Sequence, residues 1–187
     1  MIRAFIAVEI DPHTVQQISA AVIQLKPRIS DIRWLPATNF HLTLQFLGDI
    51  DESKVGPVVE ALEHHLHPFP RFTINAKGLG VFPDIKRPRI LWAGLEGDHL
   101  AALASRVETS LAPLGFAPEK RAFKAHLTVG RWRQFRGSSA KLGEELAVWK
   151  SHEFGESEVE KVTLFQSVLK PEGASYHRLK VVMLGNE

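Results

Sequence analysis

The chain has 187 residues and no cysteine. It therefore forms no disulfide and offers neither a thiolate ligand for a metal nor a thiol nucleophile. Apolar runs are also short, and none approaches the ~18 residues of a membrane span. The opening segment MIRAFIAVEID turns acidic too early to contain the apolar region of a signal peptide. We therefore expect a soluble, cytoplasmic protein.

The composition fits a single folded unit with a substantial core. Hydrophobic residues make up 44% of the chain and charged residues 24%, both ordinary values for a globular protein. The length suits one large domain or two small, closely joined lobes. Because no low-complexity linker divides the sequence, we expect residues 1–187 to form one bilobal domain. We also expect the protein to be a monomer.

Basic residues are clustered, although the net charge is only +2. Clusters of this kind suit a partner that carries phosphate, whereas the alternative is an ordinary solvated surface. Two of the three groups flank the second of the motifs described next, which favours the functional interpretation there. The groups are Lys86, Arg87 and Arg89; Lys120, Arg121 and Lys124; and Arg131, Arg133 and Arg136.

Two short stretches are nearly identical, HLTL at residues 41–44 and HLTV at residues 126–129. Both lie in runs that favour β-strands. Since strand side chains alternate between faces, each histidine shares a face with the threonine two positions later, and the aliphatic residues point into the core. If the two strands face each other, two imidazoles and two hydroxyls converge on one site.

The surroundings of the two motifs repeat the same order of elements. Residues 3–10 and 89–95 are expected to be strands, and each is followed by apolar residues at helical spacing. The helices are expected to begin at Asp11 and Asp98 and to end before prolines at positions 27 and 113. His41 lies 38 positions after Arg3, and His126 lies 37 positions after Arg89.

The segments that follow the motifs also correspond. We expect a helix over 53–66 and strands over 72–76 and 79–82 after the first motif. After the second, we expect a helix over 141–149 and strands over 159–168 and 176–184, joined by a turn at 170–173. The predicted fold class is α+β: a duplicated, bilobal unit whose two mainly antiparallel sheets face a central cleft, with helices outside.

Two histidines and two threonines suit acid–base chemistry on a phosphate ester. With a reference pKa of ~6.5, one imidazole can donate a proton while the other accepts one. The hydroxyls can donate hydrogen bonds to phosphate oxygens as charge develops. This chemistry needs no metal. A single His-x-Thr in a strand would be an ordinary structural feature, but two copies at equivalent places in a repeat favour function.

At these residues the sequence resembles the 2H phosphoesterase superfamily, which is named for its two His-x-Thr-x motifs. Within it, the chain is similar to the LigT-like RNA 2′,3′-cyclic phosphodiesterases of bacteria and archaea, also called 2′-5′ RNA ligases. The similarity spans the whole chain. It includes RAFIAV at the start, HLTLQFLG, GLGVFP at 78–83, HLTVGR, and LFQSVLKPEGASY at 164–176.

The resemblance implies roles for the four motif residues. His41 would be the proton donor to the leaving ribose oxygen, and His126 the proton acceptor that activates water. Thr43 and Thr128 would hold the phosphate. The implied reaction opens a 2′,3′-cyclic phosphate at an RNA end to a 2′-phosphomonoester without a metal or other cofactor. The same site would also join tRNA halves through a 2′-5′ linkage in the reverse direction.

Three further residues are candidates for substrate binding. Arg131 is similar to an arginine that follows the second motif in relatives. Strict alternation from His126 puts it on the core face, so it can contact phosphate only if a bulge at Gly130 turns it. Phe5 and Tyr176 are candidate platforms for a nucleobase, with core packing as the alternative. Phe46 falls on the core face by the same counting.

Other interpretations remain open at this stage. The protein can hydrolyse another cyclic or linear nucleotide, bind RNA ends without catalysis, or use its histidines as ligands of a catalytic metal. No carboxylate adjoins either motif, which counts weakly against the metal site. His64, His65 and His67 are interpreted as the solvated end of a helix.

Overall fold

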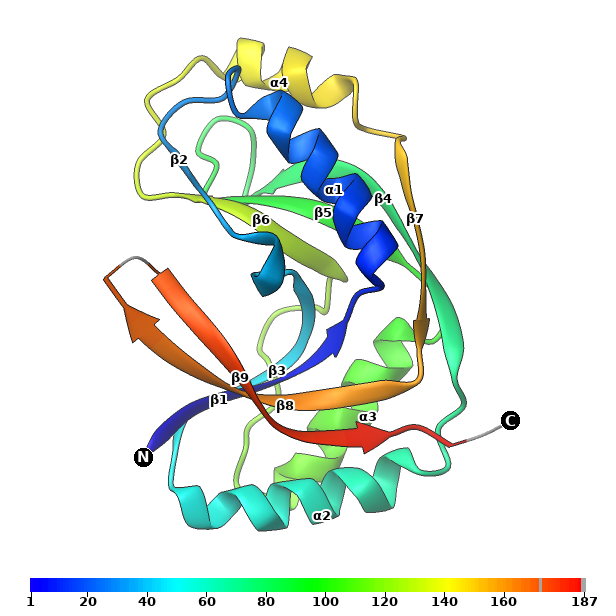
Figure 1. Ribbon diagram of the computed structural model, residues 1–187. Helices are drawn as coiled ribbons and strands as arrows, with labels where there is room; N and C mark the ends of the chain where they lie inside the picture. Colours follow the sequence, from blue (N-terminus) through cyan, green and yellow to red (C-terminus); the bar gives the residue numbers. More distant parts are fainter. Residues whose placement is uncertain (172, 186–187) are drawn as a thin grey trace.

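Two antiparallel sheets face each other in the computed structural model, which describes residues 1–171 and 173–185 (Figure 1). The first sheet has the strand order β3–β1–β8–β9, and the second has the order β2–β6–β5–β4–β7. The strands of the first sheet are β3 (His41–Ile50), β1 (Ile2–Glu9), β8 (Lys161–Lys170) and β9 (Gly173–Met183). Those of the second are β2 (Ile32–Trp34), β6 (His126–Trp132), β5 (Ile90–Glu96), β4 (Phe72–Phe82) and β7 (Glu153–Val159).

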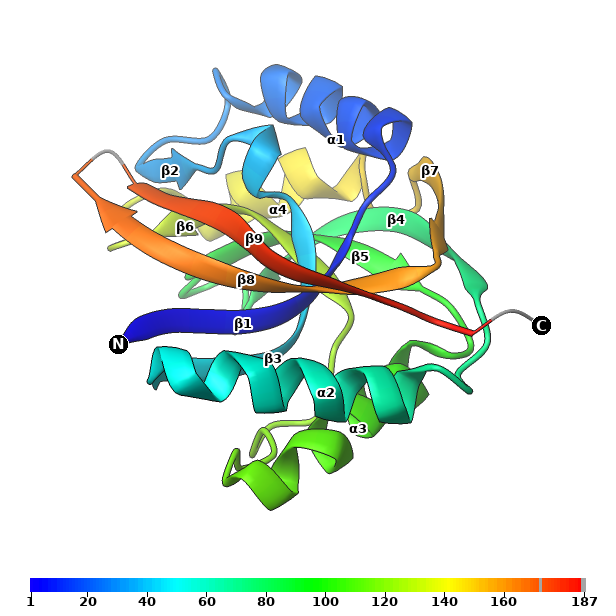
Figure 2. The same ribbon diagram turned by 60° about the horizontal axis from the view of Figure 1, so that its bottom comes forward.

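Four α-helices lie within the described residues, and they cover the outer faces of the sheets. Helix α1 (Pro12–Leu25) packs against β7 and lies with α4 (Ser139–Ala147) over the second sheet (Figure 1). Helices α2 (Val55–Leu66) and α3 (Leu100–Leu111) pack on each other beneath the first sheet, as Figure 2 shows. Short 3-10 helices span Ala37–Asn39 (η1), Glu52–Lys54 (η2) and Ala112–Leu114 (η3). The expected α+β class, with two antiparallel sheets and helices outside, is confirmed.

Helices α1 and α3 each follow a strand of one sheet and pack on the other sheet. Strand β1 belongs to the first sheet, yet the helix that follows it covers the second sheet. Strand β5 belongs to the second sheet, yet α3, which follows it, contacts β3 of the first. The apolar faces of the four helices and the outer faces of both sheets join into one connected core cluster. The two sheets are therefore held together by shared packing.

The strand orders of the two sheets correspond. Apart from β2, the order β6–β5–β4–β7 repeats the order β3–β1–β8–β9, with each motif strand at the same place beside the first strand of its half. A duplicated unit predicts this match for β1 and β3 against β5 and β6. The next strands are exchanged between the sheets, since β4 of the first half lies in the second sheet and β8 of the second half lies in the first. The treatment of residues 1–187 as one bilobal domain stays a prediction.

Several local predictions differ from the structure. Strand β4 is continuous where two strands were expected, because a register shift between Ala76 and Leu79 accommodates Gly78 at a positive φ of 75°. Strands β2 and β7 were not predicted. The N-cap of α3 is His99 rather than Asp98. Of the expected 170–173 turn, residue 172 lies outside the described residues. No described helix has both the length and the apolar character needed to cross a membrane.

Candidate active site

The two motif strands share one pattern of burial, which a bulge in each strand explains. In β3 and in β6, the histidine and the threonine are half-buried, the aliphatic residues are buried, and the residue five positions after the histidine is exposed. The pairing register shifts opposite Leu44 in β3 and opposite Val129 in β6, so each strand carries one extra residue there. A bulge reverses the alternation of the residues beyond it. Phe46 and Arg131 are therefore turned to the inner faces of the sheets, beside the motif side chains.

His41 is held by hydrogen bonds on both ring nitrogens. Its Nδ1 lies 2.8 Å from the backbone oxygen of Asn39, and its Nε2 lies 3.1 Å from Oγ1 of Thr43. Asn39 is itself fixed, because its side-chain amide donates to the backbone oxygen of Ala174 in β9 at 2.8 Å. The imidazole is packed against Phe5, with ring centroids 4.8 Å apart, and meets Tyr176 edge-on at 5.0 Å.

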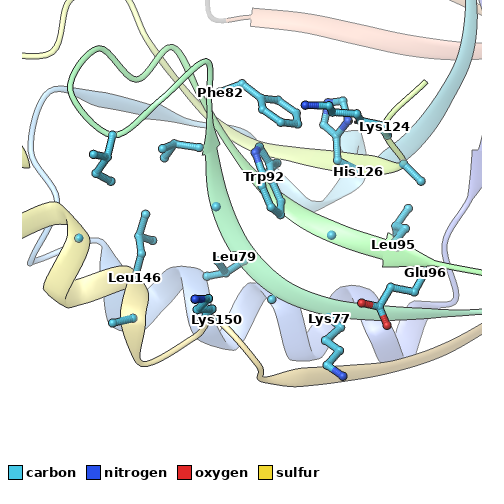
Figure 3. A pocket seen from close by; sticks show the side chains of 18 residues that line it. Lys77, Leu79, Phe82, Trp92, Leu95, Glu96, Lys124, His126, Leu146 and Lys150 are labelled. Atoms are coloured by element: carbon cyan, nitrogen blue, oxygen red, sulfur yellow. Dashed lines mark hydrogen bonds between the residues drawn. The ribbon is translucent and has the colours of Figure 1, made fainter. Parts of the chain in front are cut away.

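His126 is positioned in a matching way from the second sheet. Its Nδ1 lies 2.6 Å from the backbone oxygen of Lys124, two residues earlier, as that of His41 does from Asn39. The ring of Phe82 meets the imidazole edge-on at 5.0 Å, and Figure 3 shows Phe82, Lys124 and His126 together at one end of a cavity. Thr128 is half-buried and on the same face of β6 as His126.

The backbone contacts determine the tautomer of both rings. A carbonyl oxygen can only accept a hydrogen bond, so Nδ1 of His41 and of His126 carries the proton. In the neutral ring, Nε2 is then a free base. For His41 this nitrogen accepts from the hydroxyl of Thr43. Each imidazole can therefore act as a base when neutral, and as an acid only when doubly protonated.

Both imidazoles favour the neutral form in the free protein. Burial lowers the pKa of His41 from 6.5 to about 4; the hydrogen bond to Asn39 opposes this shift, and the charges of Arg131 and His126 add to it. Burial also lowers the pKa of His126, again against its backbone hydrogen bond and with help from Arg131. A proton donor at His41 therefore needs a negative charge nearby, which a phosphate diester supplies.

Arg131 connects the two sheets electrostatically. It lies on β6, but its charge lowers the pKa of His41 on β3 as well as that of His126. It also opposes the rise in the pKa of the Tyr176 hydroxyl on β9 that burial causes. Its guanidinium is thus placed where it acts on side chains from both inner faces. An exposed cation whose charge acts on both histidines suits a phosphate anion.

The two aromatic candidates differ in accessibility. Phe5 lies on the inner face as expected, but it is only 3% exposed and is covered by His41, Phe165 and Tyr176. It supports the imidazole and leaves almost no ring surface for a nucleobase, so its burial favours core packing, the alternative to a stacking platform. Tyr176 is half-buried beside His41 and remains a candidate contact.

Phe46 is the residue that strict alternation missed. It was assigned to the core face, yet the bulge leaves its side chain 57% exposed on the inner face, with its ring 6.0 Å from that of Phe5. A large exposed aromatic side chain beside a half-buried histidine suits contact with a base. One sequence feature could have indicated this placement of Phe46: it lies five residues after His41, as Arg131 lies five residues after His126.

Clusters that would suit a metal do not occur in the part of the chain that the structure describes. Across residues 1–171 and 173–185, no three histidine, aspartate or glutamate side chains gather closely enough to hold an ion, and this includes His64, His65 and His67. His65 instead uses Nδ1 to contact the backbone oxygen of Ala61 within α2.

Strands β3 and β6 contact each other, each carries a half-buried histidine, and the charge of Arg131 acts on both imidazoles. Such a pair of histidines with a nearby arginine is suited to acid–base chemistry on phosphate esters. Comparison with known proteins identifies the group more closely. Residues 8–92 and 95–176 match the family model described as LigT like Phosphoesterase. The chain belongs to this family.

Named relatives cover nearly the whole chain. A protein from Archaeoglobus fulgidus is 35% identical over 180 residues, which is 96% of this chain and 98% of the relative. One from Aquifex aeolicus is 39% identical over 156 residues, 82% of each chain. Both carry the name RNA 2′,3′-cyclic phosphodiesterase.

Solved structures agree on the fold. A crystal structure of a Thermus thermophilus protein matches with a TM-score of 0.81 at 27% identity, covering 100% of both chains. The structure of Escherichia coli LigT complexed with 3′-AMP matches with a TM-score of 0.78 at 22% identity, covering 98% of both chains.

Proposed function

We propose that this protein hydrolyses 2′,3′-cyclic phosphate ends of RNA to 2′-phosphomonoesters, using His41 and His126 and no metal. The observation that carries the proposal is geometric: the motif strands β3 and β6 belong to different sheets yet contact each other, and each carries a histidine whose Nδ1 is fixed by a backbone oxygen. The activity named for the relatives and the 3′-AMP bound to Escherichia coli LigT support an RNA-like substrate.

The proposed reaction is an in-line displacement at phosphorus. Neutral His126 accepts a proton from water at Nε2 while the water oxygen forms a bond to phosphorus. The bond from phosphorus to O3′ breaks, and O3′ takes the proton from Nε2 of protonated His41. The 2′ oxygen keeps the phosphate. Thr43, Thr128 and Arg131 stabilise the charge that develops on the non-bridging oxygens.

The division of roles follows the family resemblance and fits the electrostatics under one condition. His41 has a pKa of about 4 in the free protein, so it must gain its proton as substrate binds. A phosphate diester carries one negative charge, which favours the imidazolium next to it. The hydroxyl of Thr43 must then leave Nε2 of His41, and it becomes available to a phosphate oxygen.

The decisive experiment uses an RNA oligonucleotide that ends in a 2′,3′-cyclic phosphate, with a strong chelator present. We expect turnover to a product that carries its phosphate on the 2′ oxygen. His41→Ala and His126→Ala should each lower the rate at least about a hundredfold, since general acid–base catalysis contributes ~10²–10⁴. His64→Ala is the matched control, because His64 is exposed on α2 and outside the site.

The outcomes separate the remaining alternatives. Wild-type turnover by His41→Ala or His126→Ala would refute the proposal. Activity that the chelator abolishes would point to a metal-dependent hydrolase, and binding without turnover to an RNA-end binder. Preferential formation of 2′-5′ linkages between RNA pieces would make joining the main reaction, and turnover limited to other nucleotides would exclude RNA ends.

A further inference from the structure

The inner face of the second sheet carries an aromatic wall that the proposed hydrolysis does not use. Phe82 and Trp92 lie side by side there, with ring centroids 5.2 Å apart and planes inclined by 35°. Phe82 contacts His126 at 5.0 Å, so the wall begins at the proposed catalytic base. The wall lines a cavity of about 950 Å³. Figure 3 shows the lining side chains from His126 at one end to Leu146 of α4 at the other.

The indole ring of Trp92 packs on glycines of two neighbouring strands, β4 and β5. A Cβ atom at Gly80 would lie 2.3 Å from the indole ring, and one at Gly94 would lie 3.4 Å from it. The ring therefore lies across bare backbone where any larger residue at Gly80 would displace it. One side of the indole is packed on the sheet, while the side chain is only half-buried and lines the cavity.

Trp92 is not explained by stability alone. Its Nε1 is buried and has no hydrogen-bond partner among the described residues, which is unfavourable for an indole N–H. A phenylalanine or leucine at this position would fill the same space over the glycines without burying an unpaired N–H group. An indole supported from beneath and open above is instead well suited to stack on a flat ring.

A cation without an acidic partner adjoins this wall. Nζ of Lys124 lies over the ring of Phe82, 5.5 Å from its centroid. No carboxylate pairs with Lys124 within the described part of the chain. On the opposite side, the cations Arg178 and Lys161 both form ion pairs with Glu9, which is paired with His41 across β1 and β3. A stacking surface next to an unpaired cation matches the two parts of a nucleotide, its base and its phosphate.

We propose that Trp92, Phe82 and Lys124 bind the nucleotide that precedes the cyclic end, so that the protein selects RNA over cyclic mononucleotides. This inference rests on the proposed function. If His41 protonates O3′, the terminal ribose lies on the His41 side, where Phe46 is exposed to its base. The wall beyond His126 is then left to a second base. In RNA that base belongs to the preceding nucleotide, which is joined at O5′ of the terminal ribose, so the chain must turn back past the reacting phosphate to reach the wall.

The test compares three substrates that all end in a 2′,3′-cyclic phosphate. They are a mononucleotide, a dinucleotide, and a dinucleotide whose first nucleotide has no base. For the wild-type protein we expect kcat/KM to be at least about fivefold higher with the first base than without it, as stacking on one aromatic residue supplies. Trp92→Leu should bring this ratio to within about twofold of one, and Trp92→Phe should keep most of it.

Lys124→Gln gives an independent readout. The linking phosphate is present in both dinucleotides, so this variant should lower kcat/KM for both by the same factor and weaken their salt dependence. Equal kcat/KM for the wild-type protein with and without the first base would overturn the proposal, whatever the variants do. An unchanged ratio in a folded Trp92→Leu variant would overturn it as well. Failure of the proposed function would be seen separately, as absence of turnover of all three substrates.

Discussion

His41 should make the folded protein sensitive to mild acid. In the unfolded chain its pKa is the ordinary 6.5, and in the folded protein burial lowers it to about 4. Between these values the unfolded chain binds the proton more strongly than the folded protein does. The stability that the neutral imidazole contributes is therefore fully present above pH 6.5 and is lost as the pH falls toward 4.

The size of the effect follows from the two pKa values. A difference of about 2.5 between them corresponds to about 3.4 kcal/mol over the whole window. Between pH 7.5 and pH 5.0 the linkage relation gives a loss of about 2 kcal/mol in the free energy of unfolding. His126 adds a loss of the same sign, because burial lowers its pKa too. The effect of His41 must therefore be measured as a difference between variants.

Urea unfolding at pH 7.5 and pH 5.0 measures this difference. His41→Gln, which cannot titrate, should lose about 2 kcal/mol less than the wild-type protein between the two pH values. His64→Gln, at an exposed position on α2, is the control for loss of any one histidine. NMR titration of the His41 ring should give a pKa near 4, rising when a nucleoside 2′-phosphate binds. Equal acid sensitivity of the wild-type protein and His41→Gln, or a ring pKa near 6.5, would refute the reasoning.

The remaining predictions concern catalysis. The proposed reaction needs one protonated and one neutral histidine. Because the pKa values of both histidines are lowered, kcat/KM should be maximal below pH 6.5 and should fall at higher pH, where both imidazoles are neutral and no proton donor is left. Arg131→Met should reduce kcat/KM and move the alkaline limb to higher pH, since the charge of Arg131 lowers both pKa values; a limb that stays in place would contradict this assignment. Thr43→Val removes the hydroxyl that contacts Nε2 of His41, and should cost about tenfold to a hundredfold in kcat/KM, while urea unfolding should show that the variant is still folded. Phe46→Ala should lower kcat/KM at least about fivefold if its ring stacks on the terminal base, while Leu169→Ala, at a similarly exposed position, should have no effect.

Strand alternation predicted much of this site because it depends on local geometry alone. His41 and Thr43, and likewise His126 and Thr128, share a face in the structure as expected, and the residues between them are buried. The repeat of strand, helix and motif strand indicates the two-sheet fold from the sequence alone. These signals lie within a few residues of one another or recur at a fixed interval, so a single sequence contains them.

Strand alternation within one segment could not predict the bulges in β3 and β6. A bulge is a mismatch between two strands, so its place depends on the partner, here Ile6 and Ala7 opposite β3 and Leu91 and Trp92 opposite β6. Phe46 and Arg131 were therefore assigned to the wrong face by strict counting, although a bulge at Gly130 was recognised as the alternative for Arg131. Strand β7 was missed because its sequence EFGESEV is mostly polar and contains a glycine.

The packing of α1 and α3 across the two sheets fixes the relative position of the two catalytic candidates. His41 and His126 come from different sheets, so their relative placement depends on what holds the sheets together. Helix α1 leaves the first sheet to cover the second, α3 leaves the second to contact the first, and one connected core cluster includes residues of both helices. Separating the sheets would expose Ile18 and Val22 of α1 or Leu103 and Val107 of α3, all buried, and exposure of each such side chain costs roughly 1.5–3 kcal/mol. Neither half can therefore move away from the other without disrupting the core, and the two imidazoles are kept in a fixed relation before substrate arrives.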